Sequence, residues 1–257
     1  MCILFLAIGQ HPKYPLILLA NRDEFRTRPT AKAKFWQEHP QMLAGKDLQE
    51  GGTWLGIHKQ GKLAALTNVR DIPAHQKGRK SRGHLVKDYL QGEVQAQNYL
   101  QTIQQNPMQY NPFNLLVGDL QELYVYSNMQ GKVHRLEPGF HGLSNAFLNS
   151  PWPKLGKGIA SLKQYIQGQE LDKDELFDIM QQSEKAPDHL LPDTGVGLQK
   201  ERYLSSIFIA GPDYGTSSTA IVLVDENRQV SFWERTFATE AKQTAEVHYN
   251  FAIEKNV

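Results

Sequence analysis

The stretch CILFLAIGQHPKYPLILLANRDE, residues 2–24, decides how this chain begins to fold. Two apolar runs, at 2–8 and 15–20, flank a segment that contains glycine and proline. Apolar runs of this length on either side of a turn are typical of an antiparallel β-hairpin. We therefore expect the amino terminus to lie on a sheet, with the polar residues 21–24 at the end of the second strand.

Cys2 is the only cysteine of the chain and directly follows Met1. If Met1 is removed, one residue carries both a thiol nucleophile and an α-amine with a pKa near ~8. Such an amine can accept the thiol proton near neutral pH, which is the arrangement of N-terminal-nucleophile hydrolases. A free cysteine at the start of a strand is also commonly a small buried hydrophobe. Position alone leaves both roles open.

The polar segment Asn21-Arg22-Asp23-Glu24 would lie beside the strand that bears Cys2. In a catalytic role, Arg22 would hold the thiolate or a substrate carboxylate, and Asp23 would bind and orient the terminal ammonium. In a structural role, the Arg22 and Asp23 pair would cap a tight turn and Glu24 would be solvated. The segment by itself is compatible with either role.

Two asparagines, Asn68 and Asn145, follow strand-like runs. Asparagine is poorly suited to strand interiors, so at a strand end its amide can serve as a hydrogen-bond donor. An acyl-transfer site needs such donors where oxyanion charge develops, each worth roughly 3 kcal/mol of the barrier. The commoner use of asparagine is to adopt turn geometry. Neither residue decides between these uses.

The composition argues against several classes of protein. With 28 Lys+Arg against 27 Asp+Glu the net charge is +1, so no global field attracts nucleic acid or an anionic membrane. There is no signal-peptide pattern, the apolar runs are less than half the length that a bilayer requires, and one cysteine cannot form an internal disulfide. We expect a cytoplasmic protein without a transmembrane segment. The histidines lack metal-binding spacing and no phosphate-binding glycine loop occurs, so we expect no metal.

Further strands and helices are expected in alternating blocks. The strands are expected at 54–58, 62–69, 113–117, 122–127, 132–136, 203–210, 219–224 and 229–237. The helices are expected at 81–90 with Ser81 as N-cap, at 93–105, at 152–167, and at 172–183 with Asp172 as N-cap. Blocks of strands separated by pairs of helices predict sheets packed together with helices outside, in a single domain over 1–257.

Eight motifs follow one another along the chain from Cys2 to Phe237. They are Asn21-Arg22-Asp23-Glu24, Gly51-Gly52-Thr53-Trp54-Leu55-Gly56, Thr67-Asn68-Val69-Arg70, Ser81-Arg82-Gly83, Phe113-Asn114-Leu115-Leu116-Val117-Gly118-Asp119, Gly142-Leu143-Ser144-Asn145, Tyr214-Gly215-Thr216 and Glu234-Arg235-Thr236-Phe237. Together they resemble the NRDE family, also called the transport and Golgi organisation protein 2 family. The resemblance implies an α+β fold, a four-layer αββα sandwich of mostly antiparallel sheets, similar to N-terminal-nucleophile hydrolases such as choloylglycine hydrolases and penicillin V acylases.

The resemblance also implies a set of site residues. Carried over one by one, the nucleophile, arginine, aspartate and two asparagines of these hydrolases fall on Cys2, Arg22, Asp23, Asn68 and Asn145. The sequence departs from the pattern at Ser217, because the family often has an arginine after the Tyr-Gly-Thr motif. This departure puts anion binding or late-stage proton handling in doubt.

Members of the family are linked to the movement of haem, so the resemblance implies a chaperone-like haem-binding and haem-trafficking function. A haem carrier needs an apolar cleft, basic contacts for the propionates and weak axial ligation. Arg22, Arg26 or Arg70 would meet the propionates, and Cys2 or a histidine would ligate the iron. The partner would be a protein that donates or accepts haem.

Two functions therefore compete for one site. One is haem trafficking, and the other is a cysteine amidohydrolase that cleaves a small C–N amide bond through Cys2. A hydrolase that has lost its activity and binds another apolar ligand is a third reading. The fold cannot choose among them, because function resides in the site. From the sequence we favour haem trafficking and keep the amidohydrolase as the alternative.

Overall fold

The chain forms two compact units in the computed structural model, which describes residues 2–71, 74–167 and 170–254. The first unit comprises Met1–Thr27, Arg70–Ile72 and Glu137–Asn250, and the second comprises Arg28–Val69, Pro73–Leu136 and Phe251–Val257. Each unit is thus assembled from separate stretches of the chain. The single domain expected over 1–257 stays a prediction.

A six-stranded sheet is the centre of the first unit. Its strands, in spatial order, are β10 (Gly139–Leu143), β1 (Cys2–Ile8), β2 (Leu16–Phe25), β11 (Tyr214–Val224), β12 (Gln229–Phe237) and β13 (Gln243–Ala252). The pairs β10·β1, β1·β2, β2·β11 and β11·β12 are antiparallel. In the first hairpin Cys2 lies opposite Arg22 and Ile8 lies opposite Leu16, which confirms the hairpin expected from residues 2–24.

The polar segment 21–24 forms the end of β2 and lies beside the strand that bears Cys2, as expected. The strand continues because the buried polar side chain of Asn21 is satisfied by partners from distant segments. Its Nδ2 donates to the carbonyls of Met180 and Ile207 at 2.9 and 3.0 Å, and its Oδ1 accepts from the Thr219 hydroxyl at 2.6 Å. A buried amide with all these bonds can occupy a strand interior. The tight turn that Arg22 and Asp23 would cap is wrong, because both residues lie inside β2.

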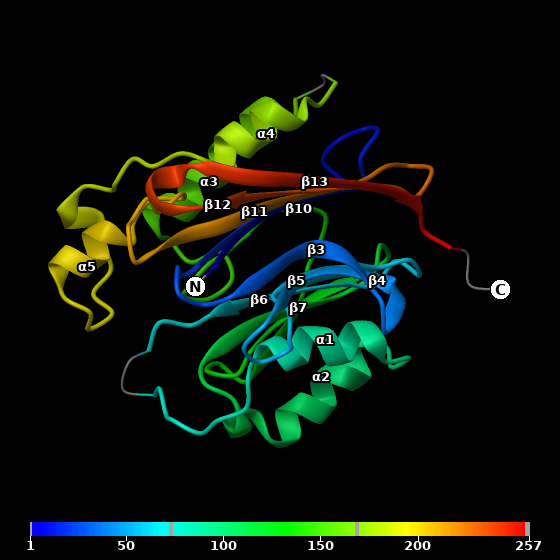
Figure 1. The fold of residues 1–257 in the computed structure, drawn as a ribbon, viewed down its shortest axis with the longest axis horizontal. Helices are drawn as coiled ribbons and strands as arrows, with labels where there is room; N and C mark the ends of the chain where they lie inside the picture. Colours follow the sequence, from blue (N-terminus) through cyan, green and yellow to red (C-terminus); the bar gives the residue numbers. More distant parts are fainter. Residues whose placement is uncertain (1, 72–73, 168–169, 255–257) are drawn as a thin grey trace. The chain divides into compact units, whose positions relative to one another are not determined.

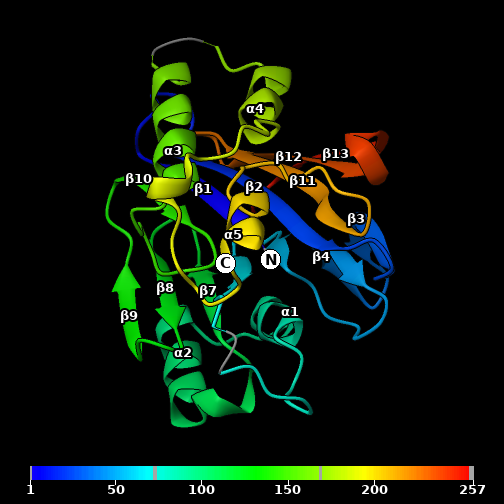
Figure 2. The ribbon, with the colours of Figure 1, turned by 90° about the vertical axis from the view of Figure 1, so that its left-hand side faces the viewer.

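Two helices of the first unit pack on one face of its sheet: α3 (Pro153–Tyr165) and α4 (Lys173–Met180). Figure 1 and Figure 2 show both helices on the same side of β1, β2 and β11. The helices expected at 152–167 and 172–183 are confirmed, with ends shifted by at most three residues. Asp172 is the N-cap of α4 as expected, because its side chain accepts from the backbone N–H groups of Asp174 and Glu175.

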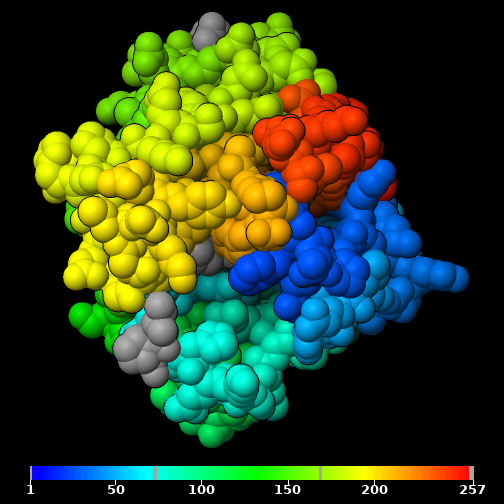
Figure 3. All heavy atoms as spheres, turned by 60° about the vertical axis from the view of Figure 1, so that its left-hand side comes forward, coloured from blue at the N-terminus to red at the C-terminus, as the bar shows by residue number. Residues whose placement is uncertain are grey.

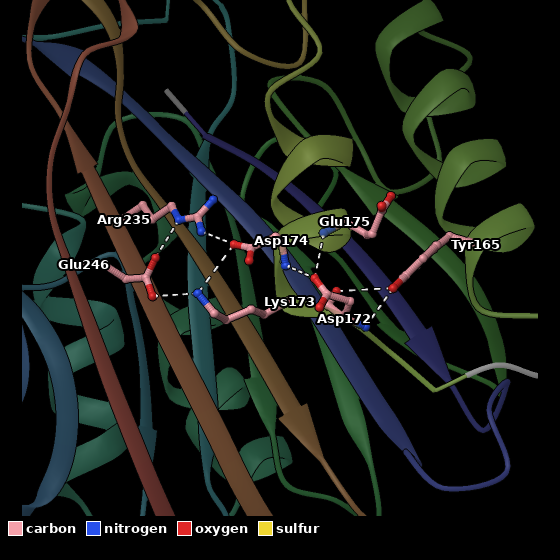
Figure 4. A network of polar contacts seen from close by, with 7 residues as sticks. All are labelled: Tyr165, Asp172, Lys173, Asp174, Glu175, Arg235 and Glu246. Atoms are coloured by element: carbon pink, nitrogen blue, oxygen red, sulfur yellow. Dashed lines mark hydrogen bonds and ion pairs between the residues drawn. The ribbon is translucent and has the colours of Figure 1, made fainter.

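A network of charged side chains links the start of α4 to β12 and β13 (Figure 4). Arg235 binds Glu246 at 2.7 Å and also Asp174, while Lys173 binds Glu246 at 2.9 Å. The Arg235 guanidinium also lies 3.8 Å from the centre of the Phe177 ring. Each exposed pair contributes little by itself, but together they fix the helix on these strands.

Gly158 in α3 allows the helix to approach β1 closely. A Cβ atom at this position would overlap the buried Phe5 ring, whose Cε1 atom lies 2.6 Å from the Cβ position. We expect Gly158→Ala to lower the free energy of unfolding by about 1–2 kcal/mol, because overpacking outweighs the gain in helix propensity. Gly156→Ala is the matched control, since its Cβ would meet no atom within 4 Å. Urea denaturation of both variants tests the expectation, and equal stability of the two would contradict it.

The second unit contains a seven-stranded sheet and two helices. The strands follow chain order: β3 (Thr30–Trp36), β4 (His39–Asp47), β5 (Leu55–His58), β6 (Leu63–Asn68), β7 (Phe113–Gly118), β8 (Leu123–Ser127) and β9 (Lys132–Arg135). Neighbouring strands are antiparallel throughout. The helices α1 (Gly83–Gln91) and α2 (Ala96–Gln105) pack their apolar faces on β4, β6, β7 and β8 (Figure 1). The hairpin expected at 54–69 and the meander at 113–136 are confirmed.

Some of the expected elements are wrong, and some of the observed elements were not expected. Arg82, not Ser81, is the N-cap of α1, and no side chain caps it. The strand expected at 203–210 is absent: the helix α5 (Leu198–Tyr203) occupies its start, and the buried residues that follow form no strand. The strands β3, β4, β10 and β13 were not expected. The α+β class with antiparallel sheets is confirmed, and no helix in the described part of the chain is long and apolar enough to cross a membrane.

Candidate active site

Cys2 lies at the first position of β1 in the first unit, with its side chain buried. Burial raises the pKa of its thiol from 9.0 to about 11, and the positive charge of Arg22 opposes part of this rise. Arg22 is the register partner of Cys2 on β2. Its Nη1 donates to the Ser217 hydroxyl at 3.2 Å and its Nη2 lies 3.6 Å from the Glu24 carboxylate. A neutral thiol thus sits beside a fixed guanidinium.

Asp23 follows Arg22 on β2 and is also buried. Its Oδ1 accepts from the Thr216 hydroxyl at 2.8 Å, and the same hydroxyl oxygen accepts from the Ile209 backbone N–H. Burial raises the pKa of the Asp23 carboxyl, and the positive charge of Lys154 opposes the rise. Asp23 is therefore held in one orientation by β11, and it offers a buried carboxyl group close to Cys2.

Asn145 approaches Cys2 from the other side of β1. It follows β10, the strand that pairs with β1, and its side chain is buried. The Ser144 hydroxyl lies within hydrogen-bonding distance of both the Cys2 carbonyl, at 3.4 Å, and the Asn145 Oδ1, at 3.3 Å. The backbone N–H of Arg70 donates to the Asn145 carbonyl at 2.8 Å. Four adjacent strands, β10, β1, β2 and β11, thus bring the thiol, an amide, a guanidinium and a carboxyl group to one end of the sheet.

Arg70 is paired inside the first unit, although its Nε and Nη2 are buried without a hydrogen-bond partner in the described part of the chain. Its Nη1 lies 2.6 Å from the Glu201 carboxylate, and both side chains are less than 7% exposed. The other oxygen of Glu201 accepts from the backbone N–H and the hydroxyl of Thr194. The Arg70 guanidinium also lies 5.1 Å from the centre of the Trp152 ring. This ion pair attaches α5 to the segment that holds Asn145.

In Figure 3 the region around α5 (yellow) lies against the start of β11 (orange), where the Tyr203 hydroxyl donates to the Tyr214 carbonyl.

Lys154 is a member of this cluster that sequence reasoning missed. It lies in the first turn of α3, is 5% exposed, and donates to the Leu204 carbonyl at 3.1 Å. Burial lowers the pKa of its ammonium to about 8, and the nearby Asp23 carboxylate opposes the fall. A lysine after Trp-Pro at a helix start gives no sign of burial in the sequence, because lysines are almost always exposed. Only the packing of α3 against 204–207 reveals it.

Ser217 and Arg26 are two residues that the sequence analysis connected with the binding of an anion. The Oγ of Ser217 accepts from Arg22, and its hydroxyl donates to the Arg22 carbonyl at 3.0 Å. The residue that replaces the usual arginine therefore contacts Arg22 directly. Arg26 donates through Nη1 to the carbonyls of Thr216 and Phe237, both at 3.0 Å. Its Nε and Nη2 are buried, and neither has a hydrogen-bond partner in the part of the chain that the structure describes.

Asn68 is the last residue of β6 in the second unit, opposite Phe113 on β7. Its expected place beside Cys2 stays a prediction. Met1, on whose removal a free α-amine at Cys2 depends, lies outside the described residues.

Comparisons with known proteins agree with the sequence motifs. Residues 1–239 match the family described as Transport and Golgi organisation 2. The Transport and Golgi organization protein 2 homolog of Homo sapiens is 38% identical over 258 residues, which is 92% of this chain and 93% of that protein. The homolog of Bos taurus is 36% identical over 257 residues, 92% of this chain and 93% of that protein. Among solved structures, the Caenorhabditis elegans N-acylethanolamine-hydrolyzing acid amidase (NAAA) ortholog has a TM-score of 0.52 at 9% identity, covering 87% of this chain and 92% of that chain. At this identity the likeness concerns the fold, which is of N-terminal-nucleophile hydrolase type.

Proposed function

The chain belongs to the Transport and Golgi organisation 2 family, and we propose that its first unit carries the site of a cysteine N-terminal-nucleophile amidohydrolase that cleaves a small C–N amide. One observation carries this proposal above the others. The only thiol of the chain lies between Asn145 and the Arg22-Asp23 pair at one end of the sheet. These are the groups that acyl transfer requires: a nucleophile, a cation beside it, a carboxyl that orients a base, and an amide donor. The likeness of the fold to that of an amidase supports the same choice.

The reaction begins when Cys2 is the first residue of the chain. Its α-amine accepts the thiol proton, and the sulfur attacks the amide carbonyl to form a tetrahedral oxyanion that the Asn145 amide stabilises. The C–N bond then breaks as the ammonium returns its proton to the leaving amine, which leaves a thioester on Cys2. Water hydrolyses the thioester, releases a carboxylic acid and restores the thiol. Asp23 orients the α-ammonium, and Arg22 stabilises the thiolate.

The base is essential because a thiol whose pKa is raised to about 11 is almost entirely protonated at neutral pH. The test is covalent labelling by a β-lactam, whose ring contains a small strained amide, with the product read by intact mass. A chain that begins at Cys2 should gain the mass of one β-lactam, and Cys2→Ser should not form a thioester. An adduct that survives in Cys2→Ser, or the absence of any adduct, would count against the proposal.

Haem binding and transfer is a second candidate, and Arg26 is the observation that favours it. Its Nε and Nη2 lack partners in the described part of the chain, and two guanidinium donors suit a propionate carboxylate. The neighbouring Phe25 is 59% exposed and packs edge-on against Tyr214, with ring centres 5.1 Å apart. The proposal includes a cytoplasmic location and a protein partner that donates or accepts the haem.

If the chain binds haem, titration should give a saturable shift of the Soret band that survives competition by albumin. Arg26→Leu should weaken this binding about tenfold or more, because it removes a charge-assisted pair. Lys163→Leu, at an exposed position on α3, is the control for a general loss of positive charge. A linear response to haem without saturation would remove this candidate.

A further inference from the structure

A cavity of about 260 Å³ lies in the first unit beside the Cys2 cluster, with which it shares Lys154. Its walls come from the first turn of α3, from the segment 182–187 that follows α4, and from the segment 205–207 that follows α5. Its volume is just below the range of roughly 300–1,000 Å³ that holds drug-sized ligands. A cavity of this size suits a small molecule and not a polymer.

The charges that line the cavity are mostly positive. Among the described residues, Lys154, Lys157 and Lys185 line it together with a single carboxylate, that of Glu184. Glu184 forms an ion pair with Lys157. Two positive charges therefore remain after this pair is counted, and the cavity attracts an anion.

Lys154 is the buried member of this lining. Its ammonium carries three N–H donors, and in the described part of the chain one of them is used, by the Leu204 carbonyl. The charges of Asp23 and Glu201 act on it favourably, while that of Arg70, the partner of Glu201, acts against it. An ammonium removed from water gains from any further oxygen acceptor. An anionic oxygen in the cavity would be such an acceptor.

Two other features of the cavity restrict the class of ligand that it can bind. The Gln182 Oε1 is buried and has no partner in the described part of the chain, while its Nε2 donates to Ser161 at 3.2 Å. A ligand with an N–H or O–H group would satisfy this acceptor. Pro153, Pro187 and Ile207 supply an apolar wall for a compact carbon skeleton.

We propose that this cavity binds a small organic anion, a carboxylate or a phosphate monoester, which carries a hydrogen-bond donor and a compact apolar body, with Lys154 as its anchor. The lining does not include Cys2. The site shares Lys154 with the Cys2 cluster but does not use the thiol, so binding is expected whether or not Cys2 is acylated.

Isothermal titration of the full chain with three matched probes tests the proposal. 4-Hydroxybenzoate and 4-hydroxyphenyl phosphate carry the two kinds of anion, and 4-hydroxybenzamide is the neutral analogue. We expect at least one anion to bind at one site with Kd below about 1 mM, and the neutral analogue to bind at least tenfold more weakly. The stronger of the two anions identifies the head group. No saturable binding of either anion, or equal binding of the neutral analogue, would overturn the proposal.

Variants locate the binding in the cavity. Lys154→Met should weaken binding of the stronger anion at least tenfold, and Gln182→Glu should do the same by introducing a negative charge without changing a residue of the Cys2 cluster. Lys163→Met removes a positive charge from the exposed face of α3 and should leave the affinity unchanged. Cys2→Ala should also leave it unchanged, which separates this site from the proposed reaction. Equal losses in Lys163→Met and Gln182→Glu would show binding elsewhere and would refute the assignment.

Discussion

A chain that begins at Cys2 should be acylated by a β-lactam at neutral pH at least about 100-fold faster than a chain that keeps Met1. The reason is the amount of thiolate. Burial raises the pKa of the Cys2 thiol from 9.0 to about 11, so without a neighbouring base the chain has about a hundredfold less thiolate at neutral pH than it would have with an unburied thiol. A free α-amine on the same residue, with a pKa near ~8, can accept the proton during attack.

The pH dependence of acylation distinguishes this explanation from simple steric access. In the chain that keeps Met1, the rate should rise about tenfold per pH unit up to about pH 11, because it follows the thiolate fraction. In the chain that begins at Cys2, the rate should level off near the pKa of the α-amine, around ~8. Steric hindrance alone would lower the rate equally at every pH. Identical rates and profiles in the two chains would contradict the role of the amine.

Asp23→Asn provides a test of positioning in the same assay. The amide keeps the size of the side chain and an oxygen that can accept from Thr216, but it removes the charge that would hold an α-ammonium. We expect slower acylation in the chain that begins at Cys2 and little change in the chain that keeps Met1. A structural role for Asp23 would instead affect both chains alike.

The parts of the fold that the sequence predicts are those in which local pattern and tertiary packing agree. The apolar runs of the hairpin of residues 2–24 pair as expected. In the strand at 229–237, buried residues alternate with more exposed ones over most of its length, as the sequence pattern predicts. The strand β13 was missed although its pattern is typical of a half-buried strand: its partly buried residues, Ala245, Val247, Tyr249 and Phe251, alternate with exposed residues that are mostly polar. Residues 204–210 were mistaken for a strand because Ile207, Phe208 and Ile209 are apolar and buried, yet their burial comes from an irregular segment.

The candidate site shows the same limit. Cys2, Arg22, Asp23 and Asn145 were identified because recognisable motifs carry them, and sheet pairing brings them together. Lys154 and Glu201 could not be identified, because nothing local marks a charged residue as buried. Their burial depends on α3, α5 and Arg70, which are far apart in the sequence and meet through packing. Ion pairs and hydrogen bonds between residues so far apart in the sequence can be recognised only in the folded structure.

Glu201→Ala should lower the free energy of unfolding by about 3–5 kcal/mol, because removal of one partner leaves a buried, uncompensated charge on Arg70. The same change removes the acceptor for the backbone N–H and hydroxyl of Thr194. Asp188→Ala is the matched control: it breaks the ion pair of the adjacent Arg202, whose partners are 42% and 48% exposed, and should leave the midpoint of urea denaturation unchanged.

A double variant separates the cost of an unpaired charge from the value of the pair itself. Arg70→Leu with Glu201→Leu removes both charges and replaces them with apolar side chains, so it should recover most of the stability that Glu201→Ala loses. Recovery would mean that the ion pair positions α5 and the segment around Arg70 and does not stabilise the unit. The position of this segment matters for the site because the backbone N–H of Arg70 donates to the Asn145 carbonyl. Acylation by the β-lactam should then fall in the double variant although the protein is folded. If the double variant is as unstable as Glu201→Ala, the buried pair itself stabilises the first unit, and its desolvation is outweighed by its attraction.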